Sequence, residues 1–353
     1  MDERGRLTAP GSLLNGAALA PGGEDVAQLP EGSENLAELA ARYGLRPSSA
    51  RPGLFTYIRM VWERRHFIVA YATARNVSMY TEARLGQLWQ VLTPLLNSAV
   101  YYLVFGILFQ ANRGISNYIA YLVTGVFIFS FTERSIVVGS TVMRANLALI
   151  RALHFPRACL PLAYVMVELE QLLLSLVVLF AIVLGTGHHY GNSLTWYWLF
   201  LVPTLILQAT FNMGAALIMA RLGAGAQDFS QLIPFLTRIW RYFCGVMYSI
   251  ASLPASLPLW AKNVLQLNPA AVYISLTRYA IMSTQREDAP GAQPYNALKC
   301  AVFNATKNPP LQAYCHPTVV TSELWLAAVG WAVVTLAVGA VFFWRAETRY
   351  GRG

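Results

Sequence analysis

Residues 160–184, LPLAYVMVELEQLLLSLVVLFAIVL, decide the fold class of this chain. The stretch carries two acidic residues, Glu168 and Glu170, and is otherwise almost entirely apolar. A helix rises about 1.5 Å per residue and the hydrocarbon layer is about 30 Å thick, so a stretch of this length crosses a bilayer as a helix. Inside lipid the backbone must satisfy its own hydrogen bonds, which excludes irregular structure for such a segment.

Five more stretches of spanning length accompany it. The chain of 353 residues is 56% hydrophobic and 12% charged, which is the composition of a protein dissolved largely in lipid. We therefore predict an all-α polytopic membrane protein with six transmembrane helices. The predicted spans are residues 87–108, 118–142, 160–184, 194–220, 229–250 and 323–344.

Basic residues gather on alternate connections between these spans. This positive-inside pattern predicts that both termini and the basic loops face the cytoplasm of a bacterium, with the protein in its plasma membrane. The net charge of +9 does not indicate a nucleic-acid partner, because no soluble basic domain exists to bind one. The basic residues are Arg59, Arg64, Arg65, Arg75 and Arg84 before the first span, Arg144, Arg151 and Arg157 before the third, Arg221 after the fourth, and Arg345, Arg349 and Arg352 after the last.

The chain divides into four regions. Residues 1–52 are rich in Gly, Ala, Pro and Ser and are predicted to be a disordered cytoplasmic tail. Residues 53–285 form the transmembrane domain, 286–321 an extracytoplasmic loop insert, and 322–353 the last span and a cytoplasmic C-terminus. Within the second region, 253–265 and 269–282 are apolar but too short to cross, which predicts a re-entrant helix pair on the outer side.

Two cytoplasmic segments have the pattern of amphipathic helices. Residues 55–80 predict an interface helix whose arginines face lipid headgroups; packing on a soluble partner is the alternative, and one face can serve each. Residues 144–156 predict a helix of two or three turns closed by Pro156. So short a helix is unstable alone, so we expect it to dock on another protein, with the bilayer surface as the alternative. The docking residues are Asn146, Leu149, Ile150, Arg151, Leu153, His154 and Phe155.

Three stretches together resemble a known family. They are RLGQLWQVLTPLL from Arg84 with VYYLVFGILF from Val100, NLALIRALHFPRACLPL from Asn146, and DFSQLIPF from Asp228 followed by Leu267-Asn-Pro. In this order and spacing they resemble the ABC-2 permeases that export polysaccharides and teichoic acids, of the Wzm and TagG/TarG type. The tail and the 286–321 insert lie outside the resemblance.

The resemblance implies a permease that pairs with itself and with two copies of a P-loop ABC ATPase to export a lipid-linked glycan. The residues support this division of labour. A P-loop needs a lysine after glycine-rich backbone, and the three lysines, Lys262, Lys299 and Lys307, follow no glycine and fall outside the cytoplasm. We therefore expect no cofactor in this chain, with ATP and Mg²⁺ on the partner and the 144–156 segment as the coupling helix.

Ionisable residues inside the spans form the first candidate site. Each costs about 2.5 to 3.5 kcal/mol at the membrane centre, so their presence needs a reason. One reason is a buried salt-bridge network; the other is that Arg238 and Arg241 bind the pyrophosphate of a lipid-linked substrate, since arginine forks match phosphate oxygens. The predicted layer, in the cytoplasmic half of the membrane, comprises Glu133, Arg134, Glu168, Glu170, Arg238 and Arg241.

Aromatic side chains form the second candidate site. Flat rings with polar tips suit a passage that a sugar polymer slides through, although ordinary packing is the alternative for each residue. The predicted substrate path comprises Tyr101, Tyr102 and Phe105 on the first span and Trp240, Phe243 and Tyr248 on the fifth.

The cysteines and histidines predict no catalytic or metal site. Cys300 and Cys315 are both extracytoplasmic and predict a disulfide across the insert, whereas Cys159 and Cys244 are predicted to be free and packed. The five histidines are scattered, so no metal-ligand set emerges. The alternatives are a drug- or lipid-exporting ABC-2 permease and a membrane glycosyltransferase. The arginine-rich, lysine-poor composition indicates a GC-rich genome. In a bacterium with such a genome, the resemblance implies a polyprenyl-pyrophosphate-linked galactan or a teichoic-acid-like polymer as cargo.

Overall fold

The computed structural model describes residues 52–79, 85–86, 88–109, 117–153, 155–190, 196–248, 250, 258–282 and 322–347. The chain divides into two units, Met1–Ala50 and Arg51–Gly353, and all described residues belong to the second. The predicted tail, apart from Pro52, and the predicted insert therefore lie outside the described residues.

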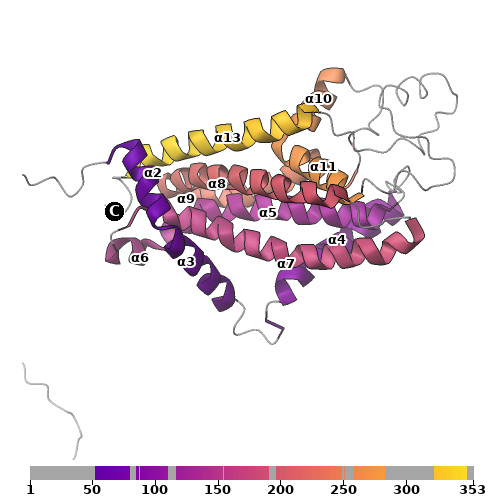
Figure 1. The fold of residues 1–353 in the computed structure, drawn as a ribbon, viewed down its shortest axis with the longest axis horizontal. Coiled ribbons are helices and arrows are strands. Elements are labelled where there is room, and N and C mark those ends of the chain that lie inside the picture. The colour runs from indigo at the N-terminus through magenta and orange to yellow at the C-terminus, as the bar shows by residue number, and fades with distance from the viewer. Residues whose placement is uncertain are drawn as a thin grey trace, which may run out of the picture. The chain divides into compact units, whose positions relative to one another are not determined.

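The described part of the second unit is built from helices (Figure 1). In chain order they are α2 (Leu54–Glu63), α3 (Arg65–Ser78), α4 (Leu88–Tyr101), the π-helix η1 (Tyr102–Leu108), α5 (Tyr118–Ala145), α6 (Leu147–Ala152), α7 (Cys159–Tyr190), the 3₁₀-helix η2 (Trp196–Phe200), α8 (Leu201–Gly225), α9 (Gln227–Phe243), α10 (Leu259–Leu267), α11 (Pro269–Met282) and α13 (Ser322–Arg345).

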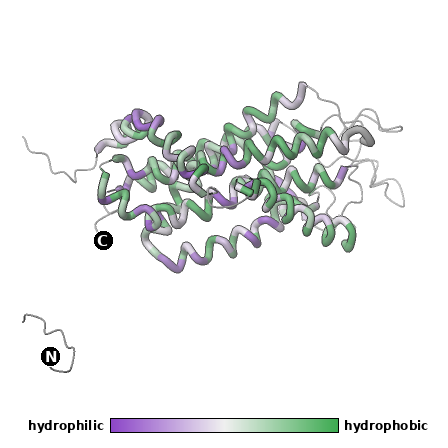
Figure 2. Tube along the Cα trace, turned by 90° about the horizontal axis from the view of Figure 1, so that it is seen from below, coloured by the Kyte–Doolittle hydropathy of each residue, from purple (hydrophilic) through white to green (hydrophobic). Residues whose placement is uncertain are grey.

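Five segments of the described chain are long and apolar enough to cross a membrane, which confirms the predicted all-α polytopic class. Hydrophobic residues run along most of the bundle helices, with hydrophilic residues interrupting them inside the bundle (Figure 2). The five segments are Leu88–Leu108, Tyr118–Ala145, Cys159–Thr186, Trp196–Gly225 and Ser322–Arg345.

The predicted span at 229–250 differs from the observed helix. α9 has 17 residues, about 25 Å at 1.5 Å per residue, and ends at Phe243. The expectation that it continues to Ile250 is wrong, because Gly245 takes a left-handed φ of 63° that ends the helical path. Whether α9 crosses the membrane as a sixth span stays a prediction.

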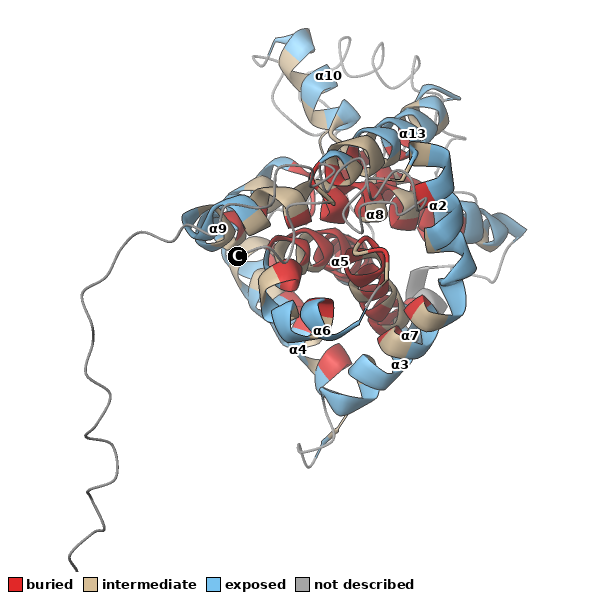
Figure 3. Ribbon diagram, turned by 90° about the vertical axis from the view of Figure 1, so that its left-hand side faces the viewer, coloured by how far each residue is buried: buried red, intermediate tan, exposed pale blue. Residues whose placement is uncertain are grey.

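α5 lies at the centre of the bundle and is buried on nearly all sides (Figure 3). A helix that is apolar all round is expected in such a position. It packs on α7, α8, α9 and α11, and α8 packs in turn on α13. The α8–α13 contact is close because Gly214 and Gly339 face each other, and a methyl group on either would overlap backbone atoms of the opposite helix.

The predicted interface helix at 55–80 is two helices. α2 ends at Glu63 and α3 begins at Arg65, with Arg64 outside helical geometry between them. α3 packs along α7 through its buried Ile68 and Ala72, while α2 leaves Phe55 86% exposed. Part of the apolar face predicted for residues 55–80 is therefore buried against α7 of the same chain. The apolar side chains that stay exposed, such as Phe55, can contact lipid or a partner.

α10 and α11 take the place of the predicted re-entrant pair. The two short helices meet at Asn268, and nearly all of α11 is buried against α5, α8 and α13. Short helices of this kind are tolerated at membrane depth only where protein covers them, as it does here for α11.

Candidate functional site

The predicted charge layer contains two ion pairs that meet at α5. Arg241 on α9 pairs with Glu133 on α5, and its guanidinium also donates a hydrogen bond to the Tyr101 hydroxyl. The side chains of Arg241 and Glu133 are 11% and 15% exposed. The guanidinium carbon lies 5.3 Å from the ring centroid of Phe129 and 5.6 Å from that of Tyr101, which adds cation–π attraction. The arrangement joins α9, α4 and α5.

The second ion pair joins α5 to α7. Arg134 Nε lies 3.6 Å from Glu168 Oε2, and Arg134 Nη1 donates a 2.7 Å hydrogen bond to Gln171 Oε1. Glu168 is 5% exposed, and within the described chain its Oε2 accepts no hydrogen bond. Because Glu133 and Arg134 are adjacent in sequence, one turn of α5 carries a charge toward α9 and the opposite charge toward α7.

Glu170 lies apart from these pairs. Its carboxylate accepts hydrogen bonds from Thr73 Oγ1 and Asn76 Nδ2 of α3, both at 3.0 Å. Asn76 Oδ1 in turn accepts a 2.8 Å hydrogen bond from Gln90 Nε2 of α4. This cluster attaches the interface helix to the first and third spans.

Arg238 differs from the other five predicted layer residues. It lies on α9 one turn before Arg241, its side chain is exposed, and within the described residues it forms no hydrogen bond or ion pair. The structure thus contains ion pairs of the kind that a salt-bridge network requires. Of the two arginines predicted to bind pyrophosphate, Arg241 is paired with Glu133, and Arg238 has no hydrogen bond or ion pair within the described residues.

The six predicted substrate-path residues fall into different surroundings. Tyr101, Tyr102 and Phe105 are half-buried and pack against the main core, with Tyr102 and Tyr118 rings 6.2 Å apart. On α9, Phe243 is 53% exposed.

The other two path residues are held by hydrogen bonds. Trp240 Nε1 donates to Asn268 Oδ1 at 3.0 Å, and the Tyr248 hydroxyl donates to the Tyr242 carbonyl at 2.9 Å. The hydrogen bond between Arg241 and Tyr101 joins α9 to α4, which continues directly into η1, and these three helices carry most of the predicted path residues. Phe243 is the most exposed of the six path residues.

The predicted coupling segment, 144–156, contains the six-residue helix α6. Arg144 and Ala145 belong to α5, and Leu153, in an extended conformation, ends α6 before Pro156, so the expectation that Pro156 closes this helix is wrong. Asn146, just before α6, accepts a 2.9 Å hydrogen bond from the Tyr71 hydroxyl of α3. Burial raises the pKa of Tyr71 to about 12, so this hydroxyl keeps the proton that it donates.

The apolar face expected on this segment is divided between the bundle and the outside. Ile150 is buried in the protein's own core, and Phe155 packs on Phe67 with ring centroids 5.4 Å apart. Arg151 and Leu153 are exposed, and Leu149 is half-buried. A partner can therefore reach Arg151 and Leu153 but not Ile150. His154 lies outside the described residues.

Cys300 and Cys315, the predicted disulfide, also lie outside the described residues. Cys159 and Cys244 are free and buried, as predicted. Among the residues that the structure describes, no group of His, Cys, Asp and Glu side chains could hold a metal ion.

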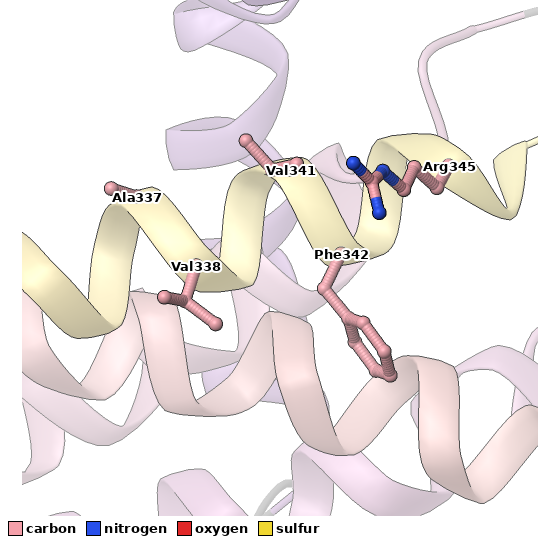
Figure 4. Close-up of a pocket in the computed structure, with 5 residues that line it drawn as sticks. All are labelled: Ala337, Val338, Val341, Phe342 and Arg345. Atoms are coloured by element: carbon pink, nitrogen blue, oxygen red, sulfur yellow. The ribbon is translucent and has the colours of Figure 1, made fainter.

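A groove of ≈ 390 Å³ lies on the surface of α13 (Figure 4). The Arg221 guanidinium lies 3.8 Å from the centroid of the Phe342 ring, beside the groove. None of the lining residues belongs to the predicted site. They are Ala337, Val338, Val341, Phe342 and Arg345.

Two polar centres were not predicted from the sequence. Arg278 on α11 is buried and donates hydrogen bonds to the carbonyls of Tyr121, Gly245 and Val246, at 2.7 to 3.2 Å. Arg278 thereby gives hydrogen-bond donors to backbone carbonyls just after the end of α9. Glu347, after α13, bonds to Tyr57 and to Arg157. The sequence offered one signal for Arg278, which is that it is the charged residue within the mostly apolar segment 269–282.

These features define a polytopic membrane protein with ion pairs buried inside its helix bundle. A family model described as ABC-2 type transporter matches residues 68–282, which is more than half of the chain. The chain therefore belongs to the ABC-2 type transporter family, and the resemblance noted in the sequence is confirmed.

Curated relatives include two proteins named O-antigen export system permease protein RfbA. The one from Myxococcus xanthus is 25% identical over 241 residues, which cover 68% of this chain and 88% of the relative. The one from Klebsiella pneumoniae is 28% identical over 207 residues, covering 58% of this chain and 75% of the relative.

Proposed function

We propose that this chain is the permease subunit of an ABC exporter that moves a polyprenyl-pyrophosphate-linked polysaccharide across the plasma membrane. A separate ATPase supplies the energy, and the working unit is a homodimer of this chain with two ATPase copies. The names of the relatives, which are O-antigen export permeases, support a polysaccharide as cargo. The galactan-like or teichoic-acid-like identity of the polymer rests on composition and on the family resemblance.

The observation that carries the proposal is the position of two arginines on α9. Arg238 is exposed and meets the pyrophosphate first, because its guanidinium is unbonded within the described chain. Arg241 follows when phosphate oxygens displace the Glu133 carboxylate as its partner. Arginine suits both steps, since its fork binds carboxylate and phosphate in the same geometry.

The aromatic residues next to these arginines form the start of the glycan path. The Tyr101 hydroxyl oxygen accepts a hydrogen bond from the Arg241 guanidinium, and the Tyr101 ring lies beside it. Phe243 follows Arg241 by two residues, on the exposed side of α9, and offers a ring face to a sugar. Tyr101 therefore belongs to both the headgroup site and the path, and Phe243 extends the path along the exposed side of α9.

Exposed apolar side chains on α4, η1 and α9 support the homodimer. They give a second copy an apolar surface beside the arginines, so that the path runs between two copies. These residues are Leu96, Val100, Leu103 and Ile107 on α4 and η1, and Phe235, Ile239 and Phe243 on α9.

The test is reconstitution of the permease with its ATPase in liposomes. A pyrophosphate-linked glycan is expected to stimulate ATP hydrolysis and to cross the membrane. Arg238→Gln should reduce the stimulation by about tenfold or more, because a charged hydrogen bond contributes about 1.5 to 3 kcal/mol, and should leave basal hydrolysis unchanged.

Arg59→Gln is the matched control, because Arg59 is an exposed arginine already paired with Glu63. Equal stimulation by lipids or drugs that lack a glycan would assign the chain to the drug- or lipid-exporting branch instead. Export by the permease alone would refute the need for an ATPase.

A further inference from the structure

A carboxylate at the end of the last helix connects three distant parts of the chain. Glu347 Oε2 accepts a 2.7 Å hydrogen bond from the Tyr57 hydroxyl of α2. Glu347 Oε1 accepts a 3.0 Å hydrogen bond from the backbone N–H of Arg157, in the connection between α6 and α7. We call Tyr57, Arg157, Ala158 and Glu347 the Glu347 clasp.

Reciprocal bonds close the clasp. The Arg157 guanidinium donates to the backbone carbonyl of Glu347, and the Ala158 N–H donates to the Tyr57 hydroxyl oxygen at 3.2 Å. One turn earlier, the Trp344 indole N–H donates to the Pro52 carbonyl at 2.9 Å. The start of α2, the start of α7 and the end of α13 are therefore linked by directional bonds rather than by shared burial alone.

The clasp is partly enclosed: Tyr57 and Ala158 are buried, and Arg157 and Glu347 are half-buried. Tyr57 is 5% exposed, and burial raises the pKa of both the Tyr57 hydroxyl and the Glu347 carboxyl. The ionisable groups around the carboxyl are Tyr57, Arg157 and, at greater range, Cys159. Removing a carboxylate from water is unfavourable unless it is hydrogen-bonded, so the bonds to Tyr57 and Arg157 stabilise the half-buried Glu347 side chain.

An apolar cluster underlies the same junction. It includes Tyr57 of α2, Ile150 of α6, Leu160 of α7, and Phe343 and Ala346 at the end of α13. Through Ile150, α6 packs against the same cluster that contains Tyr57 of α2 and the end of α13, which the clasp joins by hydrogen bonds. α2 and α13 have no short covalent path to α6, whereas α5 and α7 adjoin it in sequence.

We propose that Glu347 is a positioning residue that transmits a displacement of the α6–α7 connection to α2 and to the end of α13. This inference rests on the proposed function, because it assumes that an ATPase moves α6. With the clasp intact, the interface helix and the last helix move with α6. Without it, the movement passes along α5 and α7 and reaches α2 only through α3, which contacts the ends of the α6 segment at Asn146 and Phe155. Polymer export is then uncoupled from ATP hydrolysis.

The experiment uses two cysteine reporters in the reconstituted complex. Phe55→Cys reports on α2, where the wild-type side chain is 86% exposed, and Ala152→Cys reports on the exposed end of α6. A maleimide labels each in the presence and absence of ATP, and peptide mass spectrometry gives the labelling rate. We expect ATP to change both rates about fivefold or more, in the range of typical coupling between sites.

In a Glu347→Ala background the α6 reporter should keep its ATP response and the α2 reporter should lose most of it, because only the contacts of α3 with Asn146 and Phe155 remain. Tyr57→Phe removes two bonds of the clasp, to the Glu347 carboxylate and from the Ala158 N–H, but keeps the ring in the apolar cluster. It should therefore weaken the α2 response without unfolding the protein. Glu347→Gln keeps an acceptor for the Arg157 N–H and should lose less than Glu347→Ala. Glu323→Ala is the matched control at the exposed first turn of α13.

Two results would overturn the inference. An α2 response that survives undiminished in Glu347→Ala and in Tyr57→Phe means that the clasp transmits nothing. Loss of both reporters' responses in Tyr57→Phe means that the clasp only maintains the fold. If ATP changes neither reporter in the wild-type complex, the proposed function itself fails, and that result is distinct from both.

Discussion

Arg241 and Glu133 form an ion pair between α9 and α5 that is almost fully enclosed by the bundle. Burying two charges is unfavourable unless they satisfy each other, so each of these side chains fixes the other. The pair sets the rotation of α9 about its axis, and it holds one of the two arginines that we propose as ligands for pyrophosphate.

The pair makes single and double substitutions distinguishable. Arg241→Ala should lower the free energy of unfolding by about 3 to 5 kcal/mol, because Glu133 is left buried without a partner. Arg241→Gln combined with Glu133→Gln leaves no unpaired charge and should lose clearly less. Thermal unfolding of the purified protein in detergent measures both. If the double variant is no more stable than Arg241→Ala, the two residues do not form the pair.

Substitutions of Arg278 test whether its hydrogen-bond geometry or its positive charge stabilises the fold. Arg278→Lys keeps the positive charge but cannot reach the carbonyls of Tyr121, Gly245 and Val246 together, because its three donors share one nitrogen. Both Arg278→Lys and Arg278→Gln should cost more than about 3 kcal/mol, since several buried carbonyls lose their donors. Unfolding in detergent measures the loss, with Arg59→Lys on α2 as an exposed control. A stable lysine variant would show that charge alone suffices.

The contact between α8 and α13 predicts a steric effect. Gly214→Ala and Gly339→Ala should each destabilise the protein by about 1 to 3 kcal/mol, because the added methyl group overlaps backbone of the opposite helix. Gly330→Ala on the same α13 helix has open space and should be neutral or slightly stabilising. Melting temperatures of the three variants in detergent check the order, and an equal effect at Gly330 would contradict it.

Glu347 predicts a pH dependence of stability. Burial raises the pKa of its carboxyl above the ordinary value of 4.5, so the folded protein binds this proton more tightly than the unfolded chain. The stabilising contribution is complete below pH 4.5 and is lost as the pH rises through the raised pKa. The melting temperature of wild type should therefore fall relative to Glu347→Gln across that interval and then run parallel to it. Parallel curves throughout would contradict the raised pKa.

The aromatic path predicts a selective loss of transport. Phe243→Ala removes an exposed ring without disturbing the core, so export of long polymer should fall while basal ATP hydrolysis is unchanged. Tyr101→Ala with Phe105→Ala should impair export as well, but it also removes the hydroxyl bonded to Arg241. Phe243 is therefore the cleaner test. Unchanged polymer export in Phe243→Ala would remove this residue from the path.

The fold class followed from the sequence because spanning helices depend on local composition. Residues 160–184 and 323–344 are apolar over a bilayer's thickness whatever surrounds them, and both lie within helices. The end of α9 at Phe243 could not be predicted from local composition. Gly245 and the carbonyls after it are held by Arg278, more than thirty residues away, as its bonds to Gly245 and Val246 span 33 and 32 positions. Local patterns cannot report such a partner.

The site was predicted in its residue types and only partly in its arrangement. Charged residues inside spans are unfavourable, so their presence alone marked the layer, and Arg241, Glu133, Arg134 and Glu168 do form ion pairs. The separation of Glu170 from that layer depends on how α3 packs on α7. Likewise Ile150 was expected to face a partner, because nothing in a six-residue helix indicates that one of its apolar side chains is buried in the bundle.

The bond between Tyr57 and Glu347 joins residues 290 positions apart, and this has a consequence for biogenesis. α2 is synthesised early, yet its buried hydroxyl gains its carboxylate partner only after the ribosome has passed residue 347. Until then the nascent chain carries an unfinished junction on the side that we propose faces the cytoplasm. Chains that stop short of this residue would be open to proteolysis there, so the same bond that completes this junction also distinguishes chains that have been translated through the last helix.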